Sequence, residues 1–243
     1  MLTLFAVPKP FRGNISIIQT NAIKSWLQLH PDCEIILFGD EEGTSDVATR
    51  FGLRHIPDVK KNEYGTPLLD DVFSKAQALA SQEILCYVNA DIILMSDFLK
   101  AVKIIRERKK VFLMVGKRWD INMEESWDFS LPDWECELRN YVLRSGSPRP
   151  PEWIDYFVFP RGFYRDLLPL ALGRAAFDNW LLWKARSLKA PIIDASEVVM
   201  AVHQNHDYSH NPQGQKGVWE GEEAKRNREL MGGRHRCFTL ADA

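Results

Sequence analysis

Residues 75–94 of this 243-residue chain read Lys-Ala-Gln-Ala-Leu-Ala-Ser-Gln-Glu-Ile-Leu-Cys-Tyr-Val-Asn-Ala-Asp-Ile-Ile-Leu, and this stretch decides the fold. Apolar side chains recur at helical spacing over 68–80, which predicts a helix, and the apolar run 84–88 predicts a buried strand after it. Asn89, Ala90 and Asp91 follow directly at the carboxyl end of this strand. Because side chains alternate along a strand, we expect Asn89 and Asp91 on the same side of the chain.

The rest of the first half repeats this order of strand and helix. Short apolar runs and helical spacings predict strands at 2–7, 34–38, 54–56 and 111–115 and helices at 16–29, 45–51 and 97–108. This order indicates an α/β fold with a doubly wound, mostly parallel sheet flanked by helices. Ligands of such sheets bind at the carboxyl ends of the strands, where Asp91 stands.

The second half is less regular. We expect strands at 155–159, 192–193 and 198–203, helices at 134–145, 162–170, 178–188 and 219–231, and a mobile polar loop over 204–217. Neither an internal repeat nor a linker interrupts the chain, so a single domain over 1–243 is expected.

Composition excludes several classes of protein. The net charge of −2 gives no basic excess for nucleic acid or an anionic membrane. The amino-terminal sequence lacks the basic region of a signal peptide, and no apolar stretch approaches the length of a transmembrane span. The four cysteines are widely spaced without a C-x-x-C, which is typical of free thiols in a reducing compartment. We therefore expect a cytoplasmic protein.

Asp91 is the first candidate for chemistry. Divalent ions such as Mg²⁺ or Mn²⁺ prefer oxygen ligands, often one or two carboxylates together with substrate phosphates. A carboxylate at the end of a strand could therefore hold such an ion against a diphosphate. The alternative is a polar strand end that only caps the next element.

The helix with a basic residue, the apolar strand and the D-x-D-like triplet resemble the signature of glycosyltransferases of the GT-A fold, which use nucleotide-diphospho-sugars. That family usually has an acid at the first position of the triplet, where this chain has Asn89. The resemblance implies one GT-A-like domain, with a nucleotide-binding half at 1–116 and an acceptor and metal-completing half at 117–243.

The resemblance also implies donor contacts. Asp91 matches the metal-binding position, Lys75 matches a basic position that faces the nucleotide, and Asp40 matches an acid that contacts the base or ribose. The loop after the first strand lines the nucleotide, and its Lys9 or Arg12 could meet the diphosphate, or both could be solvated charges. The implied donor-binding set is Pro8, Lys9, Arg12, Asp40, Lys75, Asn89, Ala90 and Asp91.

Late residues complete the implied site. Asp178, at a helix start, matches the acid that deprotonates the acceptor in many inverting members, and its alternative role is a helix N-cap. Family members often carry a late histidine in the metal shell, for which His203 is the first candidate and His206 the second. Sugar or acceptor contacts are expected from aromatic rings and polar groups, namely Trp153, Asp155, Tyr156 and Asn179.

The sequence thus predicts a metal-assisted glycosyltransferase that moves a sugar from a nucleotide-diphospho-sugar, expected to be a UDP-sugar, to a carbohydrate or other hydroxyl acceptor. Two alternatives stay open: a sugar-nucleotide-binding protein without catalysis, because of Asn89, and a zinc hydrolase built on His203, His206 and His210. The chain lacks G-x-G-x-x-G after its first strand, a P-loop and G-x-S-x-G, which argues against nicotinamide oxidoreductases, P-loop kinases and serine hydrolases.

Overall fold

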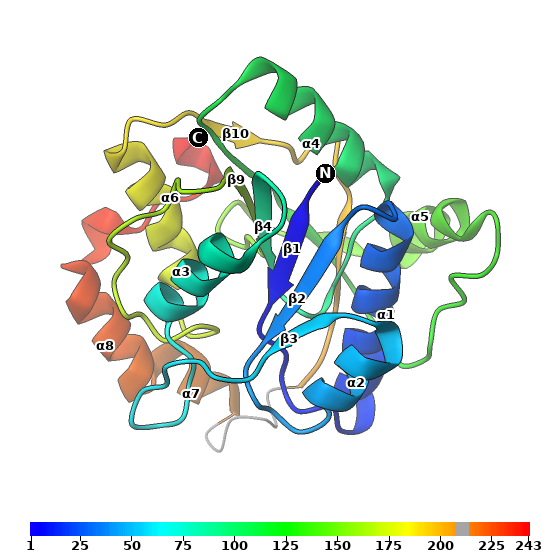
Figure 1. Cartoon of the computed structure of the whole chain (residues 1–243), viewed down its shortest axis with the longest axis horizontal. Helices are drawn as coiled ribbons and strands as arrows, with labels where there is room; N and C mark the ends of the chain where they lie inside the picture. The colour runs from blue at the N-terminus through cyan, green and yellow to red at the C-terminus, as the bar shows by residue number, and fades with distance from the viewer. Residues whose placement is uncertain (208–213) are drawn as a thin grey trace.

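A computed structural model describes residues 1–207 and 214–243. Within these residues the larger sheet has the strand order β10-β6-β9-β4-β1-β2-β3 (Figure 1). All its neighbouring strands are parallel except β9, which is antiparallel to β4 and to β6. The predicted α/β fold with a mostly parallel sheet is confirmed. The strands are β1 (Thr3–Ala6), β2 (Glu34–Phe38), β3 (Arg54–Ile56), β4 (Ile84–Val88), β6 (Leu113–Val115), β9 (Tyr156–Pro160) and β10 (Ile192–Asp194).

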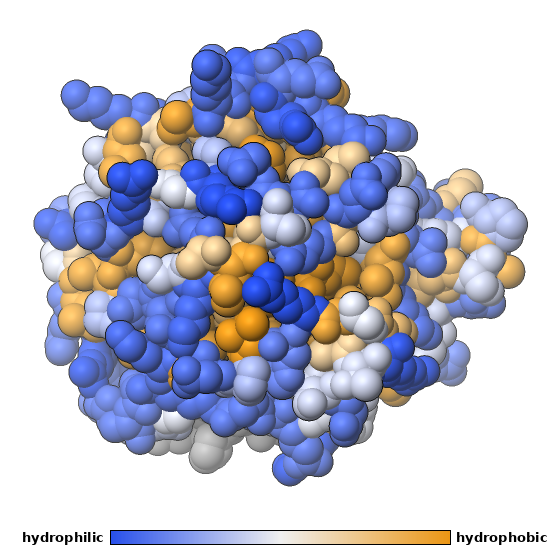
Figure 2. All heavy atoms as spheres, viewed as in Figure 1, coloured by the Kyte–Doolittle hydropathy of each residue, from blue (hydrophilic) through white to orange (hydrophobic). Residues whose placement is uncertain are grey.

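Helices cover both faces of this sheet (Figure 1). On one face α3 (Leu69–Leu79) and α6 (Phe177–Ser187) pack on side chains such as Phe5, and on the other α1 (Gly13–Leu29), α2 (Thr44–Phe51) and α4 (Ser96–Arg108) pack on side chains such as Leu4. Adjacent residues of β1 thus serve opposite layers, as strand alternation requires. Figure 2 shows apolar side chains in the middle of the viewed face, with polar side chains around them.

A second, smaller sheet positions the site. Its order is β5-β11-β7-β8, formed by β5 (Ile92–Ile93), β11 (Ala201–Gln204), β7 (Arg118–Ile121) and β8 (Ser147–Pro148). His203 lies opposite Ile92 on one side and opposite Asp120 on the other. Helix α5 (Trp134–Ser145) packs on this sheet through a third apolar cluster. The sheet therefore brings the end of β4 beside two segments that are distant in sequence.

Three expectations about secondary structure were wrong. Residues 162–170 form no helix, because Gly162 and Asp166 have positive φ angles of 77° and 52° and Pro169 lacks an amide hydrogen. The helix expected at 219–231 is two helices, α7 (Gly214–Glu220) and α8 (Glu222–Met231), so part of the expected loop 204–217 is helical. The rest of that loop lies partly outside the described residues, as does His210.

The third correction concerns the triplet. Strand β4 ends at Val88, and the amide of Ile92 donates to the carbonyl of Asn89 at 3.1 Å, which closes a turn over 89–92. Strand alternation therefore does not apply to Asn89 and Asp91.

The described part of the chain contains no helix long and apolar enough to cross a membrane. The four cysteines are free, as expected.

Candidate functional site

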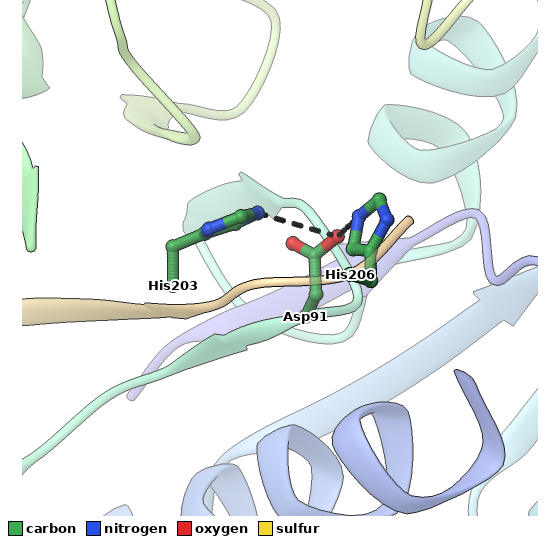
Figure 3. Close-up of side chains that lie close together, drawn as sticks. All are labelled: Asp91, His203 and His206. Carbon is green, nitrogen blue, oxygen red and sulfur yellow. Dashed lines mark hydrogen bonds and ion pairs between the residues drawn. The ribbon is translucent and has the colours of Figure 1, made fainter. Parts of the chain in front are cut away.

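Asp91 and two histidines converge at the carboxyl end of β4. Figure 3 shows the Asp91 carboxylate between the imidazoles of His203 and His206. Asp91 Oδ2 lies 3.2 Å from His206 Nε2 and 4.0 Å from His203 Nε2. One ligand atom from each residue can be chosen so that all three lie within 4.8 Å of one another. Since Asp91 is only 6% exposed, this is a largely enclosed set of one carboxylate and two imidazoles.

Buried amides hold the backbone of this cluster. Gln204 Nε2 donates to the carbonyl of Asp91 at 3.1 Å and to the carbonyl of Ile18 at 2.8 Å. Asn21 Nδ2, from α1, donates to Gln204 Oε1 at 3.0 Å. The amide side chains of Gln204 and Asn21 thus have partners, and the turn of Asp91 is tied to both β11 and α1.

Lys9 reaches the same cluster from the loop after β1. Its ammonium nitrogen lies 3.3 Å from Asp91 Oδ2 and 2.8 Å from His206 Nε2. Burial disfavours the charge of Asp91, but the charge of Lys9 and the contacts with His206 and His203 outweigh burial and hold the pKa of Asp91 well below its ordinary value. Asp91 is therefore an ionised carboxylate in a site that attracts cations.

Asp120 lies beside His203, a proximity that the sequence did not reveal. His203 Nδ1 lies 3.2 Å from Asp120 Oδ1, and Asp120 accepts hydrogen bonds from Arg118 Nε at 2.8 Å and Arg149 Nε at 2.6 Å. Burial opposes the charge of Asp120, yet these partners lower its pKa to about 2. A carboxylate behind a histidine fixes the ring and leaves the other nitrogen for a ligand.

Asp155 lies on the other side of Arg118. Its Oδ2 accepts from Arg118 Nη1 at 2.9 Å, and its Oδ1 accepts from Asn89 Nδ2 at 2.5 Å. The side chain of Asn89 is therefore directed to Asp155, while that of Asp91 is directed to the histidines. Arg118 also lies over the ring of Trp153, 4.6 Å from its centroid.

Asp178 lies in the first turn of α6, where Ala176 and not Asp178 occupies the N-cap position. Its Oδ1 accepts from the amide of Asn179 at 2.9 Å. Burial, reinforced by the charge of Asp155, raises the pKa of Asp178 to about 7 against the lowering effect of that amide. The pKa of Tyr87 on β4 is raised by burial and by the charges of Asp91, Asp155 and Asp178.

Other predicted donor residues have partners outside the Asp91 cluster. Arg12 pairs with Glu42 and Asp40 pairs with Lys61, both on the surface. Lys75 Nζ lies 2.9 Å from Asp71 and 2.7 Å from the carbonyl of Asp58. Pro8 and Ala90, which precede Lys9 and Asp91 in the chain, are buried.

Two residues predicted to contact the sugar or acceptor have partners within the protein. Tyr156 is fully buried against Phe98, on the face of β9 opposite to its neighbour Phe157. The prediction that Tyr156 contacts a sugar is therefore wrong, because alternation along β9 turns this ring into the core. Asn179 Nδ2 donates to the carbonyl of Phe238 at 3.0 Å, which ties α6 to the carboxyl-terminal segment.

The Asp91 cluster fits a divalent ion. Asp91 Oδ1 is buried and has no hydrogen-bond partner among the described residues, so a carboxylate oxygen is available there. A hollow of about 580 Å³ adjoins His206 and is also lined by Arg12, Asn14 and Asn122. The cluster thus combines a set of metal ligands with adjacent space.

Comparisons with known proteins give the fold a name. No family model and no curated protein matches the sequence. Among solved structures, the chain is similar to S. aureus TarS 1–349, with a TM-score of 0.52 and 12% identity over 84% of this chain and 60% of that one. It is also similar to glucosyl-3-phosphoglycerate synthase from Mycobacterium tuberculosis in complex with phosphoglyceric acid, with a TM-score of 0.55 and 13% identity over 98% of this chain and 80% of that one.

A complex of the same synthase with Mn²⁺, UDP and glucosyl-3-phosphoglycerate matches with a TM-score of 0.54, at 13% identity over 98% of this chain and 80% of that one. The chain spans 60% of the TarS structure, a share that leaves part of that protein without a counterpart here. At such low identity the likeness is one of architecture, and it agrees with the mixed sheet and its flanking helices. The chain has the GT-A fold of the nucleotide-sugar glycosyltransferases.

Proposed function

We propose that this protein is a metal-assisted glycosyltransferase that moves a sugar from a nucleotide-diphospho-sugar, which we expect to be a UDP-sugar, to a hydroxyl acceptor. The observation that carries the proposal is the cluster of Asp91, His203 and His206 at the carboxyl end of β4 in a GT-A fold. A protein of the same fold has been solved with Mn²⁺ and UDP, which supports the assignment.

Asp91, His203 and His206 would hold Mn²⁺ or Mg²⁺. When bound, such an ion neutralises the charge that develops on the leaving diphosphate. Both ions prefer oxygen ligands, but two imidazoles favour Mn²⁺ over Mg²⁺, because Mg²⁺ gives up its waters reluctantly and demands near-ideal octahedral geometry. Asp120 keeps the His203 ring oriented, with Nε2 toward Asp91.

Asp178 is the proposed general base. A carboxylate with a pKa of about 7 can accept the acceptor's hydroxyl proton near neutral pH as the glycosidic bond forms. This role belongs to an inverting reaction. The charge of Asp155 raises the pKa of Asp178 and that of Arg118 lowers it, and these two residues pair with each other near the end of β4.

The donor and acceptor surfaces follow the two halves of the chain. We propose that Pro8, Lys9, Ala90 and Asp91 contact the donor, and that Arg12, Asp40 and Lys75 exchange their present partners for it. We propose that Trp153 and Asp155 contact the acceptor, whereas Asn89 holds Asp155 by a hydrogen bond. In this scheme 1–116 binds the nucleotide and 117–243 completes the metal shell and the acceptor side.

A thermal-shift screen of nucleotide diphosphates and their sugars, with and without Mn²⁺, tests the proposal. We expect one nucleotide to stabilise the protein only when metal is present, because ligands that bind the folded state raise its melting temperature. Asp91→Ala should abolish this shift, and the exposed Asp46→Ala should keep it. Asp178→Asn should keep the shift and lose sugar transfer.

Two outcomes would count against parts of this proposal. Transfer by Asp178→Asn would remove the general base from the scheme. Zinc retained through purification, with no nucleotide giving a shift, would favour the hydrolase alternative.

A further inference from the structure

The ammonium of Lys9 occupies a position between two of the proposed metal ligands. It lies 2.8 Å from His206 Nε2 and 3.3 Å from Asp91 Oδ2. His206 Nδ1 lies 2.5 Å from the carbonyl of Asp207, so the other ring nitrogen, Nε2, faces Lys9 and Asp91. A carboxylate oxygen and an imidazole nitrogen thus lie within 3.3 Å of one cation that belongs to the protein itself.

The backbone of Lys9 is fixed by hydrogen bonds, but its side chain is partly exposed to solvent. Gln19 accepts from the amide of Lys9 at 2.7 Å and donates to its carbonyl at 2.8 Å, so both main-chain polar groups are held by one buried side chain. The Lys9 side chain is 29% exposed. Its flexible four-carbon stem can therefore move the charge without moving the loop.

The charges around the site are already balanced in the absence of a metal ion. Asp91 is balanced by Lys9, while Asp120 and Asp155 are balanced by Arg118 and Arg149. A divalent ion added beside Lys9 would bring two further positive charges into a largely enclosed site, where like charges repel strongly. A diphosphate supplies the negative charge that both the ion and the ammonium need.

We propose that Lys9 holds the cation position in the nucleotide-free protein, so that a divalent ion binds tightly there only together with the donor's diphosphate, to which Lys9 then moves its ammonium. This inference rests on the proposed function. It makes metal and donor binding strongly cooperative, and such coupling is reciprocal by thermodynamic necessity.

The test measures Mn²⁺ binding by the electron paramagnetic resonance signal of free Mn²⁺, with and without UDP as the probe. We expect UDP to tighten Mn²⁺ binding to the unaltered protein by about tenfold or more. Lys9→Met keeps the length of the stem and removes the charge. It should tighten Mn²⁺ binding without UDP by about tenfold and reduce the effect of UDP to a few fold.

Lys100→Met, at an exposed position of α4, is the matched control and should behave as the unaltered protein. Lys9→Gln gives a second neutral variant, and circular dichroism verifies that each variant is folded. If Mn²⁺ binds but the affinity without UDP is the same in all four proteins, the role of Lys9 is refuted while the metal site stands. If Mn²⁺ binds to none of them with or without UDP, the metal site of the proposed function fails as well.

Discussion

Replacing Asp178 by asparagine should stabilise the protein, and the gain should grow with pH. Asparagine has nearly the same shape and keeps an oxygen that can accept the amide of Asn179, now 2.9 Å from Asp178 Oδ1. It cannot ionise. The substitution therefore removes the charge of a partly buried carboxylate and little else.

The magnitude follows from the pKa of Asp178, which burial raises from 3.8 to about 7. The folded state then binds the proton more tightly than the unfolded state, so the wild-type protein loses stability as pH rises from about 4 to about 7. At about 1.4 kcal/mol for each tenfold change in proton affinity, the raised pKa lowers the free energy of unfolding by up to about 4 kcal/mol at pH 8 and by about 1.5 kcal/mol at pH 5, where only the unfolded state has lost the proton. Asp178→Asn should recover these amounts.

Urea unfolding followed by tryptophan fluorescence measures the free energy of unfolding at both pH values. Asp46→Asn is the matched control, since Asp46 also lies in the first turn of a helix, α2, but is exposed. The control should change stability by a few tenths of a kcal/mol at either pH. A gain for Asp178→Asn that does not change with pH, or a loss of stability at pH 8, would refute the picture of a desolvated acid.

Three further predictions concern catalysis, the metal and the core. The transfer rate should rise about tenfold per pH unit below about pH 7 and level off above it, because Asp178 with a pKa of about 7 must be ionised; a rising limb centred near pH 4 in the rate profile would contradict this. Asp120→Asn should weaken Mn²⁺ binding, measured by calorimetry, by about 10- to 100-fold through misorientation of His203, and unchanged affinity would exclude this role. Phe73→Ala should cost about 3–5 kcal/mol in urea unfolding, since its ring packs 5.1 Å from Phe5 and 5.7 Å from Phe159; a loss below about 1 kcal/mol would show that the core collapses around the gap.

Strong local patterns explain what the sequence could predict of the fold. The strands at 34–38, 54–56 and 84–88 and the helix at 134–145 have the predicted bounds, and Gly39, Pro57 and Gly146 mark the ends of three of them. The segment 162–170 was mistaken for a helix, since its apolar residues fit a helical spacing while Gly162 and Pro169 oppose it. A pattern of hydrophobicity gives no information about the φ angle of a single residue.

The site was predictable in its residue types but not in its pairings. Asp91 and the late histidines suggest a metal by their chemistry alone. That Asp120 serves His203 depends on the parallel pairing of β7 with β11, which joins segments about 80 residues apart in the chain. Tyr156 is buried because both faces of β9 are covered by apolar clusters, whereas Asp155 precedes the strand and pairs with Arg118.

The asparagine at the start of the triplet follows from the pairing with Asp155, and this gives a last prediction. Asn89 Nδ2 donates to Asp155 Oδ1 at 2.5 Å, so an aspartate at position 89 would place two carboxylates in contact and either repel Asp155 or share a proton with it. Asn89→Asp should therefore lower the free energy of unfolding by about 1–3 kcal/mol at pH 8, and by less at pH 5, where one proton can bridge the pair. Urea unfolding at both pH values measures the loss, with Asn140→Asp at an exposed position of α5 as control. If Asn89→Asp instead leaves stability unchanged and tightens Mn²⁺ binding, the side chain at position 89 faces the metal, and the division of roles between Asn89 and Asp91 is wrong.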